Sequence, residues 1–282
     1  MSSSRVGFMQ GRLSPLVEGK IQAFPSDHWE QEFPRATRLQ LQKMEWTVDH
    51  KGFYANPIMT EEGRERIRTL SAASGLQVVS LTGDCFMQAP FFKAEGKQYD
   101  ELLNNLHDVV KACSELRIAY LVFPLVDNGR IESDHEEDKL VAELLKLTTL
   151  LNDSDVSVLF ESDYPPQRLL EFIKRLPRDR FGINYDIGNS AALGFNCAEE
   201  IDTYAEMIRN VHIKDRLYAG TTVPLGEGAA NIPVALESLE RSGYRGNYIL
   251  QTARAMDEQH AAVLQRYRSM VIDWLEAIQN GT

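Results

Sequence analysis

The 282-residue sequence has few cysteines, few histidines and no excess of basic residues. Its three cysteines, Cys85, Cys113 and Cys197, form no C-x-x-C pair, and an odd number leaves one unpaired in any disulfide scheme. We therefore expect reduced thiols and a cytoplasmic protein. Acidic residues outnumber basic ones by 41 to 30, which gives a formal net charge of -11. This balance disfavours non-specific binding to nucleic acid.

Long apolar segments and nucleotide-binding glycine loops are also missing. No stretch approaches the ~18 consecutive apolar residues of a membrane span, and the N-terminal segment lacks the apolar stretch of a signal peptide. We expect no association with a membrane. No G-x-G-x-x-G motif follows a predicted strand, which disfavours a Rossmann fold.

Eight short apolar runs alternate with longer amphipathic stretches over the whole sequence. Several runs are almost entirely apolar, as is typical of parallel strands buried on both faces. Leucine and valine recur at helical spacing in residues 102–113 and 140–151, which predicts helices there. This alternation and the chain length favour a single-domain (β/α)8 TIM barrel over residues 1–282. The predicted strands are residues 6–9, 41–46, 76–81, 118–125, 156–160, 181–185, 211–213 and 248–250.

Two helix starts can be predicted from capping residues. Ser133 is followed three residues later by Glu136, the spacing of a capping box. Asn196 precedes Cys197-Ala198-Glu199 in a similar pattern, with Asn in place of the usual Ser or Thr.

Polar residues follow the predicted strands, and in a TIM barrel such residues converge on one mouth where the chemistry takes place. Glu161, Asp186 and His212 each directly follow or end an apolar run on three successive strands. Two carboxylates and one imidazole suit a divalent cation such as Mn, Mg, Co, Zn or Fe. The alternative is that each is an ordinary polar residue bound to neighbouring backbone, but three in order on successive strands favour a metal site.

Other polar residues near strand ends are predicted to contact the substrate or take part in catalysis. Lys214 would share the side of His212, where it polarises a substrate oxygen or else forms a salt bridge with a nearby carboxylate. Guanidinium groups match a phosphate or carboxylate in a bidentate manner. The predicted substrate-binding residues are Arg12, Glu45, Asn189, Asp215, Arg216 and Arg254.

Several motifs together resemble those of the xylose-isomerase-like sugar phosphate isomerase/epimerase superfamily. They are VLFESD, NYDIGNS and VHIKDR, with MQGRLSP near the start and MEWTVDH on the second predicted strand. The resemblance runs over nearly the whole chain. It implies a TIM barrel with one divalent metal bound by Glu, Asp, His and a second Glu, of which the first three correspond to Glu161, Asp186 and His212. Where many members have the second Glu, this chain has Gln251.

Gln251 affects the mechanism that the resemblance implies. An amide oxygen can bind a divalent cation, but it carries no charge and cannot act as a base. The resemblance implies an isomerase or epimerase that forms an enediolate with Glu161 as base. Gln251 favours chemistry that one carboxylate can carry out, such as a 1,2-isomerisation, over epimerisation with two bases. A second proton for epimerisation could come from Glu45, Asp84 or Asp215.

The expected partner is a small sugar or sugar phosphate, and association into homo-oligomers is left open. A lyase or dehydratase acting on a related polyol or keto sugar remains an alternative, since it also needs one well-placed base. A weakly metallated, non-catalytic carbohydrate-binding protein is a second alternative because of Gln251. The superfamily also includes an endonuclease for damaged DNA, which the few histidines and the net charge of -11 disfavour.

Overall fold

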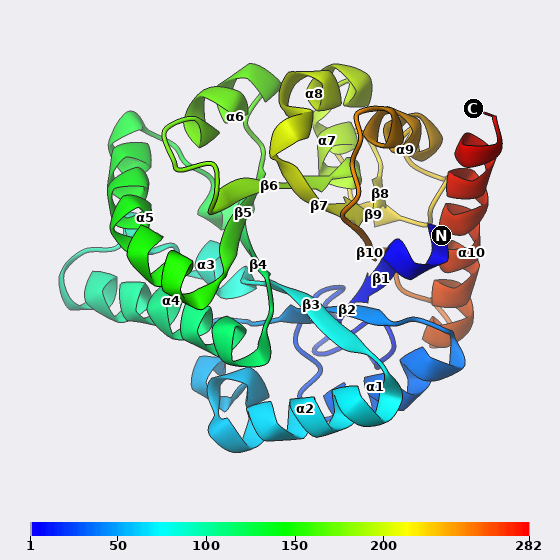
Figure 1. The fold of residues 1–282 in the computed structure, drawn as a ribbon, viewed down its shortest axis with the longest axis horizontal. Helices are drawn as coiled ribbons and strands as arrows, with labels where there is room; N and C mark the ends of the chain where they lie inside the picture. The colour runs from blue at the N-terminus through cyan, green and yellow to red at the C-terminus, as the bar shows by residue number, and fades with distance from the viewer. Residues whose placement is uncertain (1, 282) are drawn as a thin grey trace.

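Eight parallel strands close into a barrel in this computed structural model, which describes residues 2–281. The order around the barrel is β1-β10-β7-β6-β5-β4-β3-β2, and the helices surround it (Figure 1). The predicted TIM barrel is confirmed. The barrel strands are β1 (Val6–Met9), β2 (Lys43–Thr47), β3 (Gln77–Thr82), β4 (Tyr120–Leu125), β5 (Ser157–Ser162), β6 (Phe181–Asp186), β7 (Ile208–Ile213) and β10 (Asn247–Leu250).

All eight predicted strands are present, with ends that shift by a few residues. The largest shift is in β7, which begins at Ile208, three residues before the predicted start. Asn210 lies inside this extension and is fully buried. A buried polar residue breaks the apolar run that marks the strand in the sequence, and this is why the prediction began too late.

Helices cover the outside of the barrel and connect its strands (Figure 1). The predicted helical patterns lie inside α4 and α5. The helices are α1 (Trp29–Arg38), α2 (Glu61–Ser74), α3 (Asp84–Gln88), α4 (Gly96–Leu116), α5 (Asp134–Ser154), α6 (Pro166–Ile173), α7 (Ile187–Leu193), α8 (Cys197–Tyr204), α9 (Ile232–Arg241) and α10 (His260–Asn280). Short 3-10 helices are η1 (Ser2–Arg5), η2 (Phe53–Ala55), η3 (Pro57–Met59), η4 (Phe91–Lys93), η5 (Asp127–Gly129) and η6 (Ala205–Met207).

Both predicted helix starts are confirmed. The Ser133 side chain accepts a hydrogen bond from the backbone N–H of Glu136 at the start of α5. The Asn196 side chain accepts from the N–H groups of Ala198 and Glu199 at the start of α8. Each cap satisfies backbone donors that the first turn of a helix leaves without a partner.

A two-stranded antiparallel sheet follows β7. Its strands are β8 (Asp215–Arg216) and β9 (Thr222–Val223). This sheet lies directly after the C-terminal end of β7, so it extends the chain at the side of the barrel where polar residues were predicted to converge.

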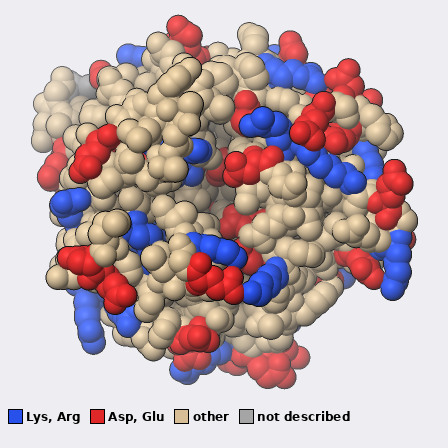
Figure 2. All heavy atoms as spheres, turned by 180° about the vertical axis from the view of Figure 1, so that it is seen from behind, with Lys and Arg blue, Asp and Glu red and all other residues tan. Residues whose placement is uncertain are grey.

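The surface carries both signs of charge. Figure 2 shows acidic and basic side chains interspersed over one face, around a central hollow. No helix among residues 2–281 is both long and apolar enough to cross a membrane.

Candidate metal centre and substrate pocket

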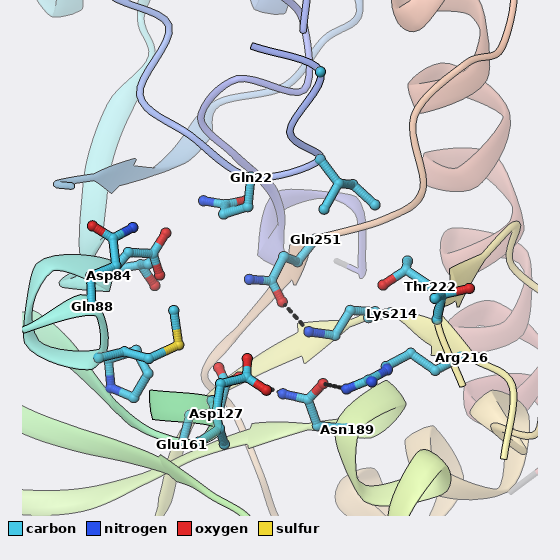
Figure 3. Close-up of a pocket in the computed structure, with 17 residues that line it drawn as sticks. Gln22, Asp84, Gln88, Asp127, Glu161, Asn189, Lys214, Arg216, Thr222 and Gln251 are labelled. Carbon is cyan, nitrogen blue, oxygen red and sulfur yellow. Dashed lines mark hydrogen bonds between the residues drawn. The ribbon is translucent and has the colours of Figure 1, made fainter. Parts of the chain in front are cut away.

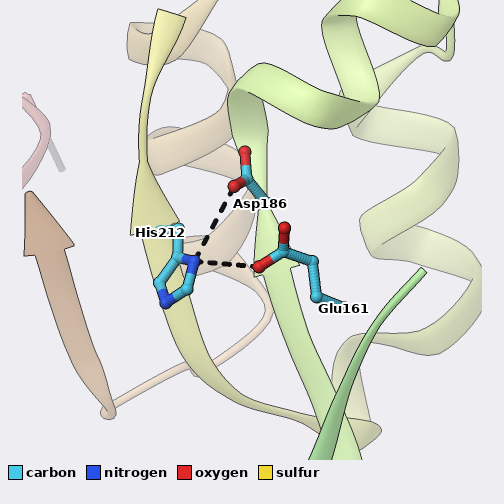
Figure 4. Close-up of side chains that lie close together, drawn as sticks. All are labelled: Glu161, Asp186 and His212. Atoms are coloured by element: carbon cyan, nitrogen blue, oxygen red, sulfur yellow. Dashed lines mark ion pairs between the residues drawn. The ribbon is translucent and has the colours of Figure 1, made fainter. Parts of the chain in front are cut away.

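Glu161, Asp186 and His212 lie together at the ends of β5, β6 and β7 (Figure 4). One potential ligand atom from each residue lies within 4.8 Å of those of the other two. The Nδ1 atom of His212 is 3.0 Å from Glu161 Oε2 and 3.7 Å from Asp186 Oδ2. All three residues are buried. The strand-end pattern thus brings two carboxylates and an imidazole to one point.

Glu45 supports His212 from inside the barrel. Its Oε1 lies 2.7 Å from His212 Nε2, and it also accepts hydrogen bonds from the hydroxyls of Ser80 and Thr82 and the amide of Asn210. If Nε2 carries the proton toward Glu45, the lone pair of Nδ1 points toward Glu161 and Asp186. A carboxylate behind a histidine in this way fixes the tautomer that a metal-binding histidine needs.

The charges around His212 favour a cation in this cluster. Although burial opposes the charged ring, the surrounding carboxylates of Glu45, Asp186 and Glu161 raise the pKa of His212 well above its usual value. A divalent cation would meet the same concentration of negative charge.

Two amides hold the carboxylate of Glu161 in place. Asn184 donates to Oε2 at 3.1 Å, and Asn189 donates to Oε1 at 2.5 Å. The backbone N–H of Asn189 also donates to Asp186 Oδ1 at 2.8 Å. Because β6 and the first turn of α7 supply these donors, rigid backbone sets the orientation of both carboxylates.

Lys214 contacts the edge of the cluster. Its Nζ lies 2.6 Å from Asp186 Oδ2 and donates to Gln251 Oε1 at 2.8 Å. A Cβ at Gly188 would be 2.8 Å from the Cγ of Lys214, so glycine leaves room for the lysine side chain. Burial disfavours ionisation of Asp186, but the charges and hydrogen bonds of Lys214 and His212 together outweigh it and lower the pKa of Asp186. Of the two roles predicted for Lys214, the salt bridge is present.

The residues of the cluster fit a divalent metal. Asp186 Oδ2 is buried and has no hydrogen-bond partner of good geometry, although the Lys214 ammonium lies close to it. The Lys214 ammonium is the cation that meets this oxygen in the structure, so a metal bound here would share the carboxylate with Lys214. Hard carboxylate oxygens with one imidazole nitrogen are a common donor set for such ions.

A cavity of about 550 Å³ opens above the cluster (Figure 3). Glu161, Lys214 and Gln251 line it, while Asp186 and His212 do not. Its size suits a small molecule. The other lining residues are Gly19, Ile21, Gln22, Thr82, Asp84, Met87, Gln88, Pro124, Val126, Asp127, Asn189, Arg216, Thr221 and Thr222.

Two of the predicted substrate-binding residues, Asn189 and Arg216, line this cavity. The guanidinium group of Arg216 donates to Asn189 Oδ1 at 2.8 Å and to the carbonyl oxygen of Gly220. Arg216 therefore links the connection between β8 and β9 to Asn189, the residue that donates a hydrogen bond to Glu161.

The other four predicted substrate-binding residues lie elsewhere, and the structure corrects their expected placement. Glu45 is fully buried within the barrel, with its oxygens occupied by protein donors. Asp215 is also fully buried and accepts from backbone N–H groups of the 226–230 loop. Arg12 donates to backbone carbonyls of Thr252 and Ile21, and Arg254 donates to that of Ser14. Asp215, Arg12 and Arg254 thus hold backbone of neighbouring loops, whereas Glu45 supports His212.

Burial and charge explain why Arg12 is a poor anion-binding group. Burial, with Arg254 nearby, lowers the pKa of Arg12 to about 9. Its Nε and Nη1 atoms already donate hydrogen bonds to Thr252, Ile21 and Gln22.

The cavity also contains residues that the sequence did not single out for substrate binding. Gln22 comes from the long loop after β1, and Gln88 and Asp127 lie in α3 and η5. No periodicity or motif places Gln22 or Gln88 at the mouth, whereas Asp127 follows the fourth predicted strand by two residues, as expected for a polar residue at a strand end. Asp84 was predicted as one of three sources of a second proton, and it lines the same cavity.

Replacing Glu45 by Gln is expected to weaken the affinity for Zn²⁺ or Mn²⁺ by about 10–100-fold, the usual cost of losing such a supporting group. Glutamine keeps the shape of the side chain but removes the charge that fixes the His212 tautomer. Titration calorimetry of the purified variant measures this affinity. Glu137→Gln is the matched control, since Glu137 is a buried carboxylate bound by Tyr164, Arg168 and Arg175 away from the cluster. Equal losses of affinity in both variants would contradict this role for Glu45.

The family of the chain follows from a comparison with known proteins. The family model described as "Xylose isomerase-like TIM barrel" matches residues 35–270. The chain belongs to this family. The predicted superfamily is thereby confirmed.

Proteins that are similar to this chain include sugar epimerases. L-ribulose-5-phosphate 3-epimerase UlaE of Escherichia coli (strain SMS-3-5 / SECEC) is 22% identical over 257 residues, covering 88% of this chain and 89% of its own. The crystal structure of IOLI protein with a binding zinc atom has a TM-score of 0.76 at 15% identity, with 97% and 99% coverage. D-psicose 3-epimerase with D-tagatose from Clostridium cellulolyticum H10 has a TM-score of 0.72 at 10% identity, with 97% and 99% coverage. The names of these epimerases support the predicted enzyme class.

Proposed function

We propose that this chain is a divalent-metal-dependent isomerase or epimerase that moves a proton on the carbon beside the carbonyl of a small sugar or sugar phosphate. The observation that carries the proposal is the cluster of Glu161, Asp186 and His212, of which Glu161 lines the cavity. The substrate class rests on the relatives, one named for a sugar phosphate and one structural neighbour for a free sugar.

Glu161, Asp186 and His212 would hold the metal. When bound, a divalent cation polarises the substrate carbonyl and stabilises negative charge that develops on its oxygen. Mn, Mg, Co, Zn and Fe all accept this set of oxygen and nitrogen donors.

Glu161 is the residue that removes the proton. It is a carboxylate that lines the cavity, and Asn184 and Asn189 fix its orientation. Gln251 cannot serve as a base because its amide does not take up a proton at neutral pH. One base on one face is enough to form an enediolate from a ketose.

Lys214 would orient the substrate and balance its charge. Its ammonium group is held by Asp186 and Gln251 and lines the cavity. Three N–H donors on one nitrogen allow it to keep these partners and still donate to a substrate oxygen.

Hydrogen exchange with solvent tests the proposed function. The Mn²⁺-loaded protein is incubated in D₂O with L-ribulose 5-phosphate, D-tagatose or D-psicose, and NMR follows the protons next to the carbonyl. We expect deuterium to replace such a proton in at least one of these ketoses, and EDTA to stop the exchange. A protein that exchanges none of the three, with or without metal, would not have this function.

A non-catalytic carbohydrate-binding protein is the second candidate. The observation that favours it is the Lys214 ammonium, which already contacts Asp186 and Gln251 where a metal would add its charge. In that case the purified protein would bind a ketose without metal and exchange no proton. A lyase or dehydratase would exchange or remove the same proton, and NMR would show a product of different composition.

Replacing Gln251 by Glu is expected to tighten Mn²⁺ binding by about tenfold or more, equal to about 1.4 kcal/mol. The new carboxylate adds a full negative charge beside the cluster, and unit charges about 4 Å apart interact by ~4 kcal/mol even at an effective dielectric constant of about 20. Calorimetric titration with Mn²⁺ measures the change. Gln279→Glu on α10, remote from the cavity, controls for the change in net charge. Unchanged affinity in Gln251→Glu would place residue 251 outside the influence of the metal.

A further inference from the structure

Asp84 is a buried carboxyl group that the proposed mechanism does not use. It is the first residue of α3, directly after β3 and Gly83. A Cβ at Gly83 would lie 2.4 Å from the ring of Phe86, so glycine allows the tight turn from the strand into the helix. This turn brings Asp84 to the cavity, where it is 6% exposed.

The closed barrel places Asp84 on the wall across from Lys214. In the strand order, β3 and β7 are separated by three strands on either side. Figure 3 shows Asp84 with Gln88 at one side of the cavity and Lys214 at the other, with Gln22 and Gln251 between them. A substrate bound beside the metal cluster would therefore lie between the cluster and Asp84.

Glu161 and Asp84 approach the cavity from strands on either side of β4. Pro124 and Val126, at and just beyond the end of β4, line the cavity between them. A planar enediolate with its edge toward β4 would present one face toward Glu161 and the other toward Asp84. This is the arrangement that inversion at a carbon requires.

The surroundings of Asp84 keep its carboxyl group protonated. The charged groups that face it are Asp49 from the segment after β2, Glu45 from β2, Glu161 from β5 and Arg12 from the loop after β1. The Gln22 side chain also forms a hydrogen bond with it. Burial, followed by the charges of Asp49 and Glu161, raises the pKa of Asp84 to about 8. A protonated carboxyl group can act as an acid.

We propose that Asp84 is the second proton-transfer residue of the site and delivers a proton to the face of the substrate opposite Glu161. This inference rests on the proposed function and specifies that the reaction is an epimerisation. It supplies the acid that Gln251 cannot provide.

The step balances as follows. Glu161 takes the proton from the carbon beside the carbonyl. The electron pair of that C–H bond forms the C=C bond of the enediolate, and the π pair of the C=O bond moves onto the carbonyl oxygen. The Asp84 carboxyl group then gives its proton to the opposite face of the same carbon, where the C=C π pair forms the new C–H bond while a lone pair of the oxygen forms the C=O bond again. Glu161 ends protonated and Asp84 ionised, and exchange of protons with water restores both.

Asp84→Asn tests the proposal in the Mn²⁺-loaded full chain, with the same three ketoses in D₂O. We expect epimer formation to fall by about 10²–10⁴-fold, the usual contribution of a general acid, while recovered substrate still gains deuterium through Glu161. Asp84→Ala, which cannot form a new hydrogen bond with Gln22, is expected to behave in the same way. Asp202→Asn is the matched control, because Asp202 is exposed on α8, and this variant should keep the wild-type rate.

Three results would overturn the proposal. Epimer formation at the wild-type rate in both Asp84 variants would remove Asp84 from the reaction while leaving the proposed function intact. Equal losses of epimer formation and deuterium exchange, with unchanged Mn²⁺ content and thermal stability, would assign Asp84 to substrate binding. Absence of exchange in the wild-type protein would instead refute the proposed function, and this inference with it.

Discussion

Replacing Glu161 by Gln is expected to lower kcat/KM by about 10²–10⁴-fold, the range that a general base contributes. The variant keeps an oxygen that can bind the metal and accept one hydrogen bond from Asn184 or Asn189. It loses the group that takes the proton, so deuterium exchange next to the carbonyl should fall by the same factor. NMR in D₂O at saturating Mn²⁺ measures this exchange.

The control for this prediction is Glu171→Gln, which removes an exposed carboxylate from α6 and should leave the exchange rate unchanged. Full exchange in Glu161→Gln at saturating metal would show that another residue is the base.

Replacing His212 by Gln is expected to weaken Zn²⁺ binding by at least ~100-fold, since losing even a supporting residue costs about 10–100-fold. It should also abolish thermal stabilisation by the metal. In the wild-type protein, free Zn²⁺ at 100 times its Kd should raise the free energy of unfolding by about 2.7 kcal/mol. Differential scanning calorimetry with and without Zn²⁺ measures both proteins.

His135→Gln is the matched control, because His135 is exposed on α5 away from the cluster. Stabilisation of His212→Gln by Zn²⁺ to the same extent as the wild type would place the metal elsewhere. Because the change also leaves Glu45 without its buried partner, the metal-free variant should be less stable by about 1–3 kcal/mol.

The fold and the grouping of the three candidate metal ligands could be predicted because both depend on regular strands. Every strand was marked by an apolar run that alternates with amphipathic stretches. In a parallel barrel, residues at the C-terminal ends of the strands meet at the mouth. Glu161, Asp186 and His212 each end a strand or lie within one residue of its last position. Their order along the chain was therefore enough to predict that they lie close together.

The substrate contacts were harder to predict because depth within the barrel depends on where each strand ends. The second strand was predicted to end at Trp46, but β2 continues to Thr47, and Glu45 lies inside the barrel instead of at its mouth. Asp215 alternates with Lys214, so it points away from the cavity and toward the backbone of the 226–230 loop.

Arg12 and Arg254, unlike Arg216, do not line the cavity, and the reason is different. Arg12 lies three residues beyond the end of β1, in a turn where strand alternation no longer fixes direction. The sequence shows a guanidinium group near a strand end, but not that backbone carbonyls from other loops will use its donors. Loop geometry set by long-range contacts has no local signal.

Anomalous diffraction from crystals of the wild-type protein soaked in Zn²⁺ tests the central claim most directly. We predict a strong zinc peak bounded by Glu161, Asp186 and His212, with ligand distances of about 2.0–2.2 Å. The absence of a peak there at saturating Zn²⁺, with Lys214 still on Asp186, would contradict the assignment of this cluster as a metal centre.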